Sequence, residues 1–441
     1  MTTALTSHQR DMLIVGVIAL IARVLLFAVY GPAVEMDSHE YLAVGRQLLG
    51  MDFGHYTGRR TPVYPLFAAL LGGIPWLIHM VQALAGVAAS MMAADIARRM
   101  TASRLVTFIC GITCALALPV LLAEAAILTE SLTSALLITL LWLYLRWRDD
   151  IAQGNSRNRY IVLMGSIAAL LVLLRPQFAF VPLVVIVAVG VVLRKNAMPL
   201  RQMVMVTLIA GIPVVAWAGF NAAFTGVYAI ATGGGFSMTN HTIGYVEDAP
   251  EAFSRERDIL LKHRTQRIAE AGTPLMTISR AMPDLRTTTG LNDARLAKRL
   301  GEMNTALIMR NPGAYAASVV VSWARFWSVR TMLLRSGTDS ETTYSFLAVV
   351  VTIWRYGLML ANAVFLLLLA CAVVPVIRHK MFSMPGMWFA VVLILGSSLM
   401  QALAERGENA RYGMPTQMLV VIVLAAALWS LYKGRRAYSA G

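Results

Sequence analysis

Cysteine and charged residues are scarce in this chain of 441 residues. It has three cysteines, and only 14% of its residues are charged whereas 58% are hydrophobic. The three cysteines fall within apolar stretches, so neither a disulfide framework nor a cysteine-based metal motif is predicted. So little charge, with a mean hydropathy of +0.65, excludes an ordinary soluble globular protein. The composition predicts an all-α, polytopic membrane protein.

Acidic residues are also fewer than basic ones. The chain has 23 Asp and Glu against 38 Lys and Arg, which gives a formal net charge of +15. Cationic loops kept on the cytoplasmic side explain part of this excess, but the predicted outer loops are basic too. A basic outer surface favours an anionic partner such as lipid phosphate; a solvated basic loop above an anionic bilayer is the alternative.

Ten apolar stretches approach the roughly 20 residues that a membrane-spanning helix needs. They lie near 11–30, 77–97, 104–122, 126–146, 160–175, 177–194, 202–221, 345–377, 385–403 and 412–432. Arginine and lysine gather in alternate loops between them, and such loops stay cytoplasmic during insertion. The pattern predicts a multi-pass protein of a plasma membrane, the inner membrane in a bacterium, with both termini in the cytoplasm.

The same count places two long segments outside, 31–76 and 222–344, together with the turn 404–411. We therefore expect a membrane core over 1–221, an external region over 222–344 and further membrane helices over 345–441. The helix predicted within 313–330 is apolar, but counting it as a span would invert every later loop. We interpret it as interfacial, with Trp323 and Trp327 at the depth of the lipid headgroups.

The first external segment begins GPAVEMDSHEYLAVGRQLLG, with Asp37, Tyr41, Val44 and Leu48 near helical spacing before Gly50. This spacing predicts a short amphipathic helix with Asp37 at its N-terminal end. A carboxylate there is most often an N-cap, which satisfies free backbone N–H groups. It is alternatively a general base that accepts a proton from a hydroxyl at the water interface.

The stretch GRRTPVYPLF, residues 58–67, places Arg60 beside two prolines. Prolines fix the chain direction and are tolerated where a helix begins, so the stretch predicts a sharp entry into a helix at the membrane surface. An interfacial arginine commonly extends to lipid headgroups. A guanidinium held by a rigid turn is also suited to binding a phosphate.

Several ionisable residues lie inside or at the ends of predicted spans, where burial is costly, and so they are candidates for function. Many fall near the external face, the same side as Asp37 and Arg60. The alternative is that Glu130 and an arginine form a structural interhelical pair, and one pair of this kind is expected to be structural. The candidates are Arg23, Glu124, Glu130, Arg175, Glu405, Arg406, Glu408 and Arg411.

Taken in order, eight stretches resemble one family, the GT-C glycosyltransferases of family 39, which use polyprenyl-phosphate sugars and include the protein O-mannosyltransferases. The resemblance covers nearly the whole chain. It rests on DSHEYLAVGRQLL, RTPVYPLFAALL, QALAGVAASMMAADIARR, LTESLTSALLITLLWL, LLRPQFAFVPL, NAAFTG, RNPGAYAASVVVSWARFW and ENARYGMPTQMLVVIVLA. It implies a GT-C fold with about ten transmembrane helices and external loop helices.

The resemblance also implies roles for single residues. Asp37 matches the first-loop aspartate that activates the acceptor hydroxyl. Arg60 and Tyr64 match an Arg-Pro-x-Tyr-Pro element, although Thr61 here stands between Arg60 and Pro62. The implied activity is transfer of a hexose or pentose from a polyprenyl phosphate, with inversion, to a protein, lipid or glycan acceptor of the cell envelope.

Further matches lie later in the chain. Glu130 matches the acid of the Thr/Ser-Glu-Ser/Thr string, Arg175 the arginine of a Leu-Arg-Pro turn, and Arg411 with Tyr412 a late Arg-Tyr pair. A donor phosphate needs fixed cations at headgroup depth, and the candidates for this role are Arg60, Arg175 and Arg411. Glu405 and Tyr412 are further site candidates.

One departure concerns the acidic residue that many relatives carry directly after the first-loop aspartate. This chain has Ser38 there and an acid only at Glu40, which is kept as a site candidate. No metal site or other cofactor is predicted, and a divalent cation stays open. Two rivals also stay open: a polysaccharide polymerase or ligase with lipid-linked glycans, and a transporter, which the lack of internal repeats disfavours. No nucleic-acid partner is expected.

Overall fold

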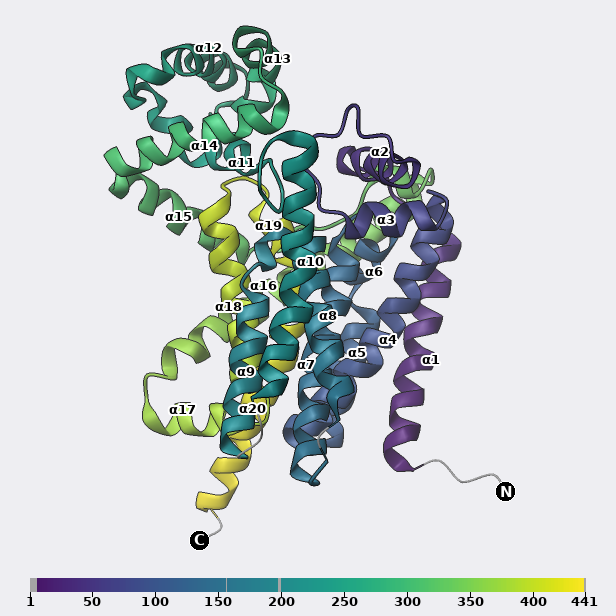
Figure 1. Cartoon of the computed structure of the whole chain (residues 1–441). Coiled ribbons are helices and arrows are strands. Elements are labelled where there is room, and N and C mark those ends of the chain that lie inside the picture. Colours follow the sequence, from purple (N-terminus) through teal and green to yellow (C-terminus); the bar gives the residue numbers. More distant parts are fainter. Residues whose placement is uncertain (1–5, 156, 197–199, 440–441) are drawn as a thin grey trace.

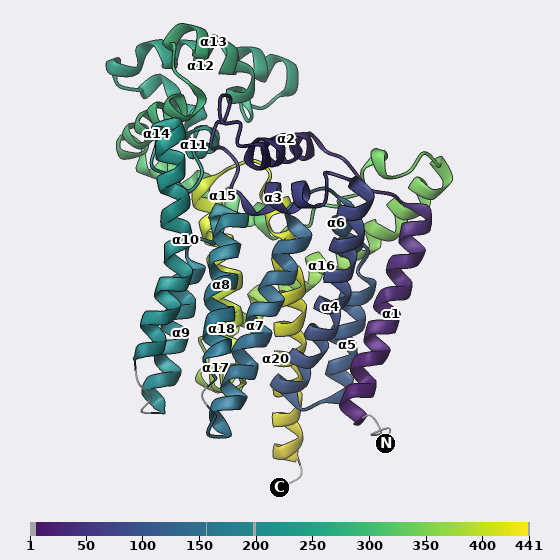
Figure 2. The same cartoon turned by 45° about the vertical axis from the view of Figure 1, so that its right-hand side comes forward.

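A long helical bundle carries a layer of shorter helices at one end (Figures 1 and 2). The computed structural model describes residues 6–155, 157–196 and 200–439, and within these ranges it contains no β-strand, only an isolated bridge between Ala33 and Ala126. The bundle comprises α1 (Ser7–Val29), α4 (Pro75–Thr101), α5 (Arg104–Leu116), α6 (Leu118–Ala125), α7 (Glu130–Ala152), α8 (Asn158–Leu174), α9 (Val181–Lys195), α10 (Arg201–Thr225), α16 (Glu341–Cys371), α18 (Met387–Ala404) and α20 (Gln417–Ser439).

The bundle has the helices of a multi-pass membrane protein. By length and apolar composition, seven helices of the described chain are able to cross a membrane, and the bent pair α5–α6 makes an eighth. The other two predicted stretches also form helices within the bundle, α7 and α8, but α8 has only 17 residues and α7 carries more polar side chains. Each of the ten predicted stretches thus coincides with a helix or with the bent pair.

Two spans differ from their predicted bounds. The stretch predicted at 104–122 bends by 43° where α5 ends and α6 begins, because Pro119 cannot continue the hydrogen-bond ladder of the preceding helix. The stretch predicted from 126 becomes helical only at Glu130, after an extended segment that pairs with Ala33.

One end of the bundle is covered by two groups of helices. The segment 31–76, predicted to be external, forms α2 (Met36–Gly50) and α3 (Val63–Leu70). The segment 222–344, also predicted to be external, forms α11 (Gly234–Thr242), α12 (Ser254–Ala271), α13 (Thr277–Thr289), α14 (Asp293–Arg310) and α15 (Pro312–Phe326). Helix α1 begins and α20 ends at the opposite end of the bundle in both views. The chain ends themselves, 1–5 and 440–441, lie outside the described residues.

Helices α11 to α14 have a small hydrophobic core of their own, to which Leu260 and Leu300 belong. Asn292 caps α14, since its side chain accepts a hydrogen bond from the Arg295 backbone N–H at 2.9 Å. Gly233, Gly234 and Gly235 stand at the start of α11. A Cβ on Gly235 would lie 1.8 Å from the Ala297 carbonyl oxygen, so this glycine permits close packing of α11 on α14.

Helix α15 is not among the candidate spans, as predicted. The depth of Trp323 and Trp327 relative to the lipid headgroups stays a prediction. Trp327 is buried, with its ring 5.8 Å from that of Phe365. The Trp323 indole donates a hydrogen bond to Ser398 Oγ at 3.1 Å. Both side chains therefore pack α15 onto the bundle, because the bundle already supplies apolar partners and a hydrogen-bond acceptor.

The segment that leads into α2 is held from two sides. Ala33 exchanges backbone hydrogen bonds with Ala125 and Ile127, and Gly31 donates one to Gly337. The Tyr30 hydroxyl, almost fully buried, donates to the Leu334 carbonyl at 2.9 Å and accepts from the Leu334 N–H at 2.8 Å. These contacts fix where α2 begins, and with it the position of Asp37.

Candidate active site

Asp37 lies in the first turn of α2 and binds two arginines. Its carboxylate oxygens accept hydrogen bonds from Arg60 at 2.6 Å and from Arg411 at 2.7 Å. The N-cap residue of α2 is Glu35, whose backbone N–H donates to Ser38 Oγ at 3.0 Å. The interpretation of Asp37 as an N-cap is therefore wrong, because its carboxylate is turned toward guanidinium groups from distant parts of the chain.

Arg60 is held by acidic and aromatic neighbours on α2. Its Nη2 and Nε atoms donate to Glu40 Oε2 at 2.6 and 2.9 Å, and its Nη1 donates to the Tyr41 hydroxyl at 3.2 Å. Thr61, which stands between Arg60 and Pro62, is buried, and its hydroxyl donates to the Leu174 carbonyl at 3.0 Å. This bond ties the turn of GRRTPVYPLF to the end of α8, and the prolines then start α3.

Arg411 lies in α19 (Asn409–Tyr412) and joins Asp37 to Glu130. Its Nε donates to Glu130 Oε1 at 2.6 Å, and the Glu130 side chain, at the start of α7, has no exposed surface. A buried carboxylate needs such a partner, since an uncompensated buried charge is very costly. Residues 374 positions apart in sequence, Asp37 and Arg411, thus meet in one network.

Arg175 follows α8 and completes the group of buried cations. Its Nη2 lies 3.5 Å from Glu130 Oε1, and its guanidinium lies 4.7 Å from the centre of the Tyr412 ring. Its Nη1 is buried and has no hydrogen-bond partner in the structure. Arg175 therefore keeps donor capacity that the protein does not use, which a buried anion would satisfy.

Tyr64 and Glu405 lie beside these ion pairs. The Tyr64 ring packs edge-on against Tyr41 with centroids 5.0 Å apart, and its hydroxyl donates to Gln82 Oε1 at 3.0 Å. Tyr64 therefore supports Tyr41, which in turn contacts Arg60. Glu405 accepts a hydrogen bond of 3.4 Å from Gln401, and burial raises the pKa of its carboxyl above the ordinary value.

Two residues of this network were not predicted from the sequence, Glu35 and Arg330. Arg330 Nη2 donates to Glu35 Oε1 at 3.1 Å and forms a second ion pair with Glu408, while Glu35 Oε2 lies 3.5 Å from Arg411. Nothing in the local pattern around Arg330 marks it. For Glu35, its place two residues before Asp37 was a usable signal, because both lie at one helix end.

The charges around Asp37 set its ionisation. Burial acts to raise the pKa of the Asp37 carboxyl, but Arg60 and Arg411 outweigh it and hold this pKa below the ordinary value. Burial alone would lower the pKa of Arg60, whereas Tyr41, Asp37 and Glu40 together raise it. Asp37 is therefore an anion and Arg60 a cation throughout the neutral range.

A second buried ion pair lies elsewhere in the bundle. Arg23 Nη2 on α1 donates to Glu124 Oε1 on α6 at 2.6 Å, and both side chains are almost fully buried. Glu124 lies so close to α4 that a Cβ on Gly86 would come within 1.9 Å of its Oε1. The pair joins α1 to the bent α6 beside α4, and a structural role for it stays a prediction.

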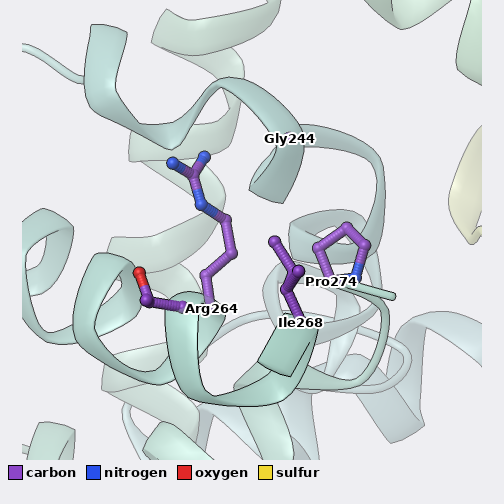
Figure 3. A pocket seen from close by; sticks show the side chains of 5 residues that line it. Gly244, Arg264, Ile268 and Pro274 are labelled. Atoms are coloured by element: carbon purple, nitrogen blue, oxygen red, sulfur yellow. The ribbon is translucent and has the colours of Figure 1, made fainter. Parts of the chain in front are cut away.

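A pocket of about 390 Å³ lies beside α12, away from the Asp37 network (Figure 3). Its Arg264 already pairs with Glu247 at 2.6 Å. The lining consists of Gly244, Arg264, Thr265, Ile268 and Pro274. Among the described residues, no three His, Cys, Asp or Glu side chains are arranged to hold a metal ion.

Comparison with known proteins gives distant structural likenesses only. No family model and no curated protein sequence matches the chain. Among solved structures, ArnT from Cupriavidus metallidurans bound to undecaprenyl phosphate has 14% identity and a TM-score of 0.38 over 96% of this chain and 78% of that one.

The archaeal oligosaccharyltransferase AglB from Archaeoglobus fulgidus, in complex with an inhibitory peptide and a dolichol-phosphate, has 12% identity and a TM-score of 0.43. The match covers 98% of this chain and 51% of AglB, so the chain spans about half the length of that protein. Likenesses this distant do not assign a function to the chain.

Proposed function

We propose that this protein is a membrane-embedded, inverting glycosyltransferase of the GT-C type that moves a sugar from a polyprenyl phosphate to an acceptor hydroxyl. The observation that carries the proposal is the carboxylate of Asp37 held between Arg60 and Arg411, with the buried Arg175 close by. The carboxylate would act as a base, and the fixed cations beside it would bind a phosphate. Both lie at one end of an apolar bundle, where a lipid-linked sugar would enter.

The donor phosphate is best accommodated by Arg175, with Arg60 and Arg411 as further contacts. Arg60 and Arg411 each donate to a carboxylate at 2.6 Å, whereas Arg175 has a buried Nη1 without a partner. An incoming phosphate would first satisfy this free donor. It would then share the remaining guanidinium groups with Asp37 and Glu130, and the apolar polyprenyl tail would lie against the bundle.

Transfer then requires a single displacement at the anomeric carbon. The oxygen of the acceptor hydroxyl forms the new bond, Asp37 takes the hydroxyl proton, and the bond from the anomeric carbon to the phosphate oxygen breaks. The electron pair leaves with the polyprenyl phosphate, whose added negative charge the arginines stabilise. Because the pKa of Asp37 is lowered, it is a weak base, and positioning must supply much of its effect.

The finer features of the proposal follow from the arrangement of the helices and from the sequence resemblance. Helices α11 to α15 cover the same end of the bundle as α2 (Figure 2), so the external region 222–344 would shape the acceptor site. The proposed donor is a polyprenyl-phosphate hexose or pentose, as in family 39. The proposed location is a bacterial inner membrane, with the site on the outer face and both termini in the cytoplasm.

The test uses purified protein in nanodiscs with a panel of radiolabelled polyprenyl-phosphate monosaccharides and a membrane extract as the acceptor source. Asp37→Asn removes the proposed base, and Asp52→Asn is the matched control because Asp52 is exposed in the same external segment. We expect one donor to be consumed by the parent protein and by the control, and consumption to fall at least 100-fold in Asp37→Asn.

Two results would refute the proposal. One is that no donor is bound or consumed, while lipid moves between leaflets in a flux assay, which would favour a transporter. The other is that Asp37→Asn turns over the donor as fast as the control, which would remove the proposed base.

A further inference from the structure

Among the arginines outside the Asp37 network that have no carboxylate partner in the described part of the chain, two lie on or beside α15. Arg325, at the end of α15, and Arg406, just after α18, form no ion pair within the described residues. By contrast, Arg60, Arg175, Arg330 and Arg411 each have at least one acidic partner. Uncompensated cations this near a dense set of paired charges call for a physical explanation.

Arg325 and Arg406 lie along one face of α15. Ser318, Ser322 and Arg325 are spaced four and three residues apart, which places them on the same side of the helix. The segment after α18 lies along this side: Ser322 Oγ donates to the Glu405 carbonyl at 2.6 Å, and Arg406 Nη1 donates to Ser318 Oγ at 3.4 Å. The guanidinium of Arg406 is thereby held beside α15.

The surroundings of Arg406 leave donors unused and add no negative charge. Its Nε is buried without a hydrogen-bond partner, and Ser318 Oγ is shared with His241 Nδ1 at 2.7 Å. Burial lowers the pKa of His241 to about 4, so this imidazole is neutral at pH 7. Burial, and then the charge of Arg325, also lower the pKa of Arg406 from its ordinary value. The like charges thus repel each other, and an anion between them would relieve this repulsion.

An apolar side chain continues the same helix surface. Val321 lies four residues before Arg325, on the same side of α15, and is 40% exposed. A ligand that matches this surface has a negative head for the two arginines and an apolar tail for Val321. Free carboxylates of the protein do not fill the position, since Glu405 and Glu408 are directed to Gln401 and Arg330.

We propose that Arg325 and Arg406 form a binding site for the phosphate of a lipid headgroup, separate from the donor site at Arg175. The lipid phosphate accepts from both guanidinium groups, and its acyl chain covers Val321. The site does not depend on the proposed glycosyl transfer, because it rests on unpaired charge and exposed apolar surface outside the Asp37 network. A lipid bound there would lie beside Glu405 and the segment that carries Arg411.

The test is native mass spectrometry of the full-length protein in detergent, titrated with phosphatidylglycerol. The double variant Arg325→Gln/Arg406→Gln should weaken binding of the first lipid roughly 30-fold, since each cation near a lipid surface contributes about a factor of five. The control Arg255→Gln/Lys298→Gln removes the same charge from exposed positions of α12 and α14, and should bind as the parent does.

A second variant keeps the test valid if the double variant folds poorly. Arg325→Glu places a carboxylate beside Arg406, so it should raise the thermal unfolding midpoint and abolish binding of the lipid. Equal lipid binding by the parent, the double variant and Arg325→Glu would overturn the proposal. So would binding of inorganic phosphate as tight as that of the lipid, because the apolar surface would then contribute nothing. Donor turnover is not used in any of these measurements, so failure here leaves the proposed function untouched.

Discussion

The buried pair of Glu130 and Arg411 offers the most direct test of how the site is held together. Glu130 Oε1 accepts from Arg411 at 2.6 Å and lies 3.5 Å from Arg175, for which it is the only carboxylate within ion-pair distance among the described residues. Arg411, in contrast, also binds Asp37 at 2.7 Å. Loss of Glu130 therefore leaves a buried cation without a partner, whereas loss of Arg411 does not leave Glu130 entirely alone.

These contacts predict an order of effects. Breaking a buried ion pair from one side costs about 3–5 kcal/mol, so we expect Glu130→Gln near the upper end of this range and Arg411→Gln near the lower end. The double variant should cost less than the sum of the two by about 1–3 kcal/mol, because the second change removes a group already without its partner.

The assay is equilibrium unfolding of the purified protein in mixed micelles, followed by tryptophan fluorescence. Glu341→Gln is the control. This glutamate pairs with Arg335 at the protein surface, where both side chains are more than half exposed, and such ion pairs contribute little to the free energy of unfolding. The reasoning is refuted if Glu130→Gln costs no more than the control, or if the free energies of the two single variants simply add.

Three further predictions concern the donor, the pH and the external helices. Arg60→Ala should lower donor turnover about 100-fold, because one charge-stabilising group is lost. The control Arg46→Ala, at an exposed position of α2, should leave turnover unchanged. Equal turnover rates in the two variants would show that Arg60 does not belong to the phosphate site. The pKa of Asp37 is lower in the folded protein than in the unfolded chain, where an aspartate has a pKa of about 4. The ion pairs of Asp37 therefore contribute their full stabilisation above about pH 4, and this stabilisation is lost as the pH falls through the lower pKa of the folded protein. Unfolding midpoints between pH 7 and about pH 3 should therefore fall more steeply in the parent than in Asp37→Asn, and parallel curves would contradict this. Gly235→Ala should destabilise the external helices by about 1–3 kcal/mol because its Cβ meets a backbone carbonyl; Gly234→Ala, with open space around it, should not, and protease sensitivity of the two variants would distinguish them.

Much of the site could be named from the sequence because ionisable residues are conspicuous in an apolar chain. Asp37, Arg60, Glu130, Arg175 and Arg411 each stood out by charge beside a span, and the structure brings all five together. Their roles in catalysis and phosphate binding remain predictions. The expectation that Asp37 is an N-cap was wrong. Preferences for residues at helix ends depend on local sequence only, and they contain no information about a contact with an arginine that is distant in sequence, such as Arg411.

Other residues gave no usable signal. Arg330 lies in an irregular segment with no pattern around it, yet it pairs with both Glu35 and Glu408. Arg23 and Glu124 looked no less functional than Glu130, although they form a separate ion pair. Only their partners separate these cases, and partners are chosen by the packing of helices.

The sequence by itself determined the helices and their membrane character, because hydropathy and length act locally: a run of apolar residues must bury its backbone polar groups in a helix wherever it lies. It also determined where the irregular, charged segments fall. The tertiary structure alone decided which charges meet, such as Glu130 with Arg411 across 281 positions, and which stay unpaired, such as Arg325 and Arg406. Ion pairs depend on distances of a few ångströms between side chains, and those distances are set by the packing of the whole bundle.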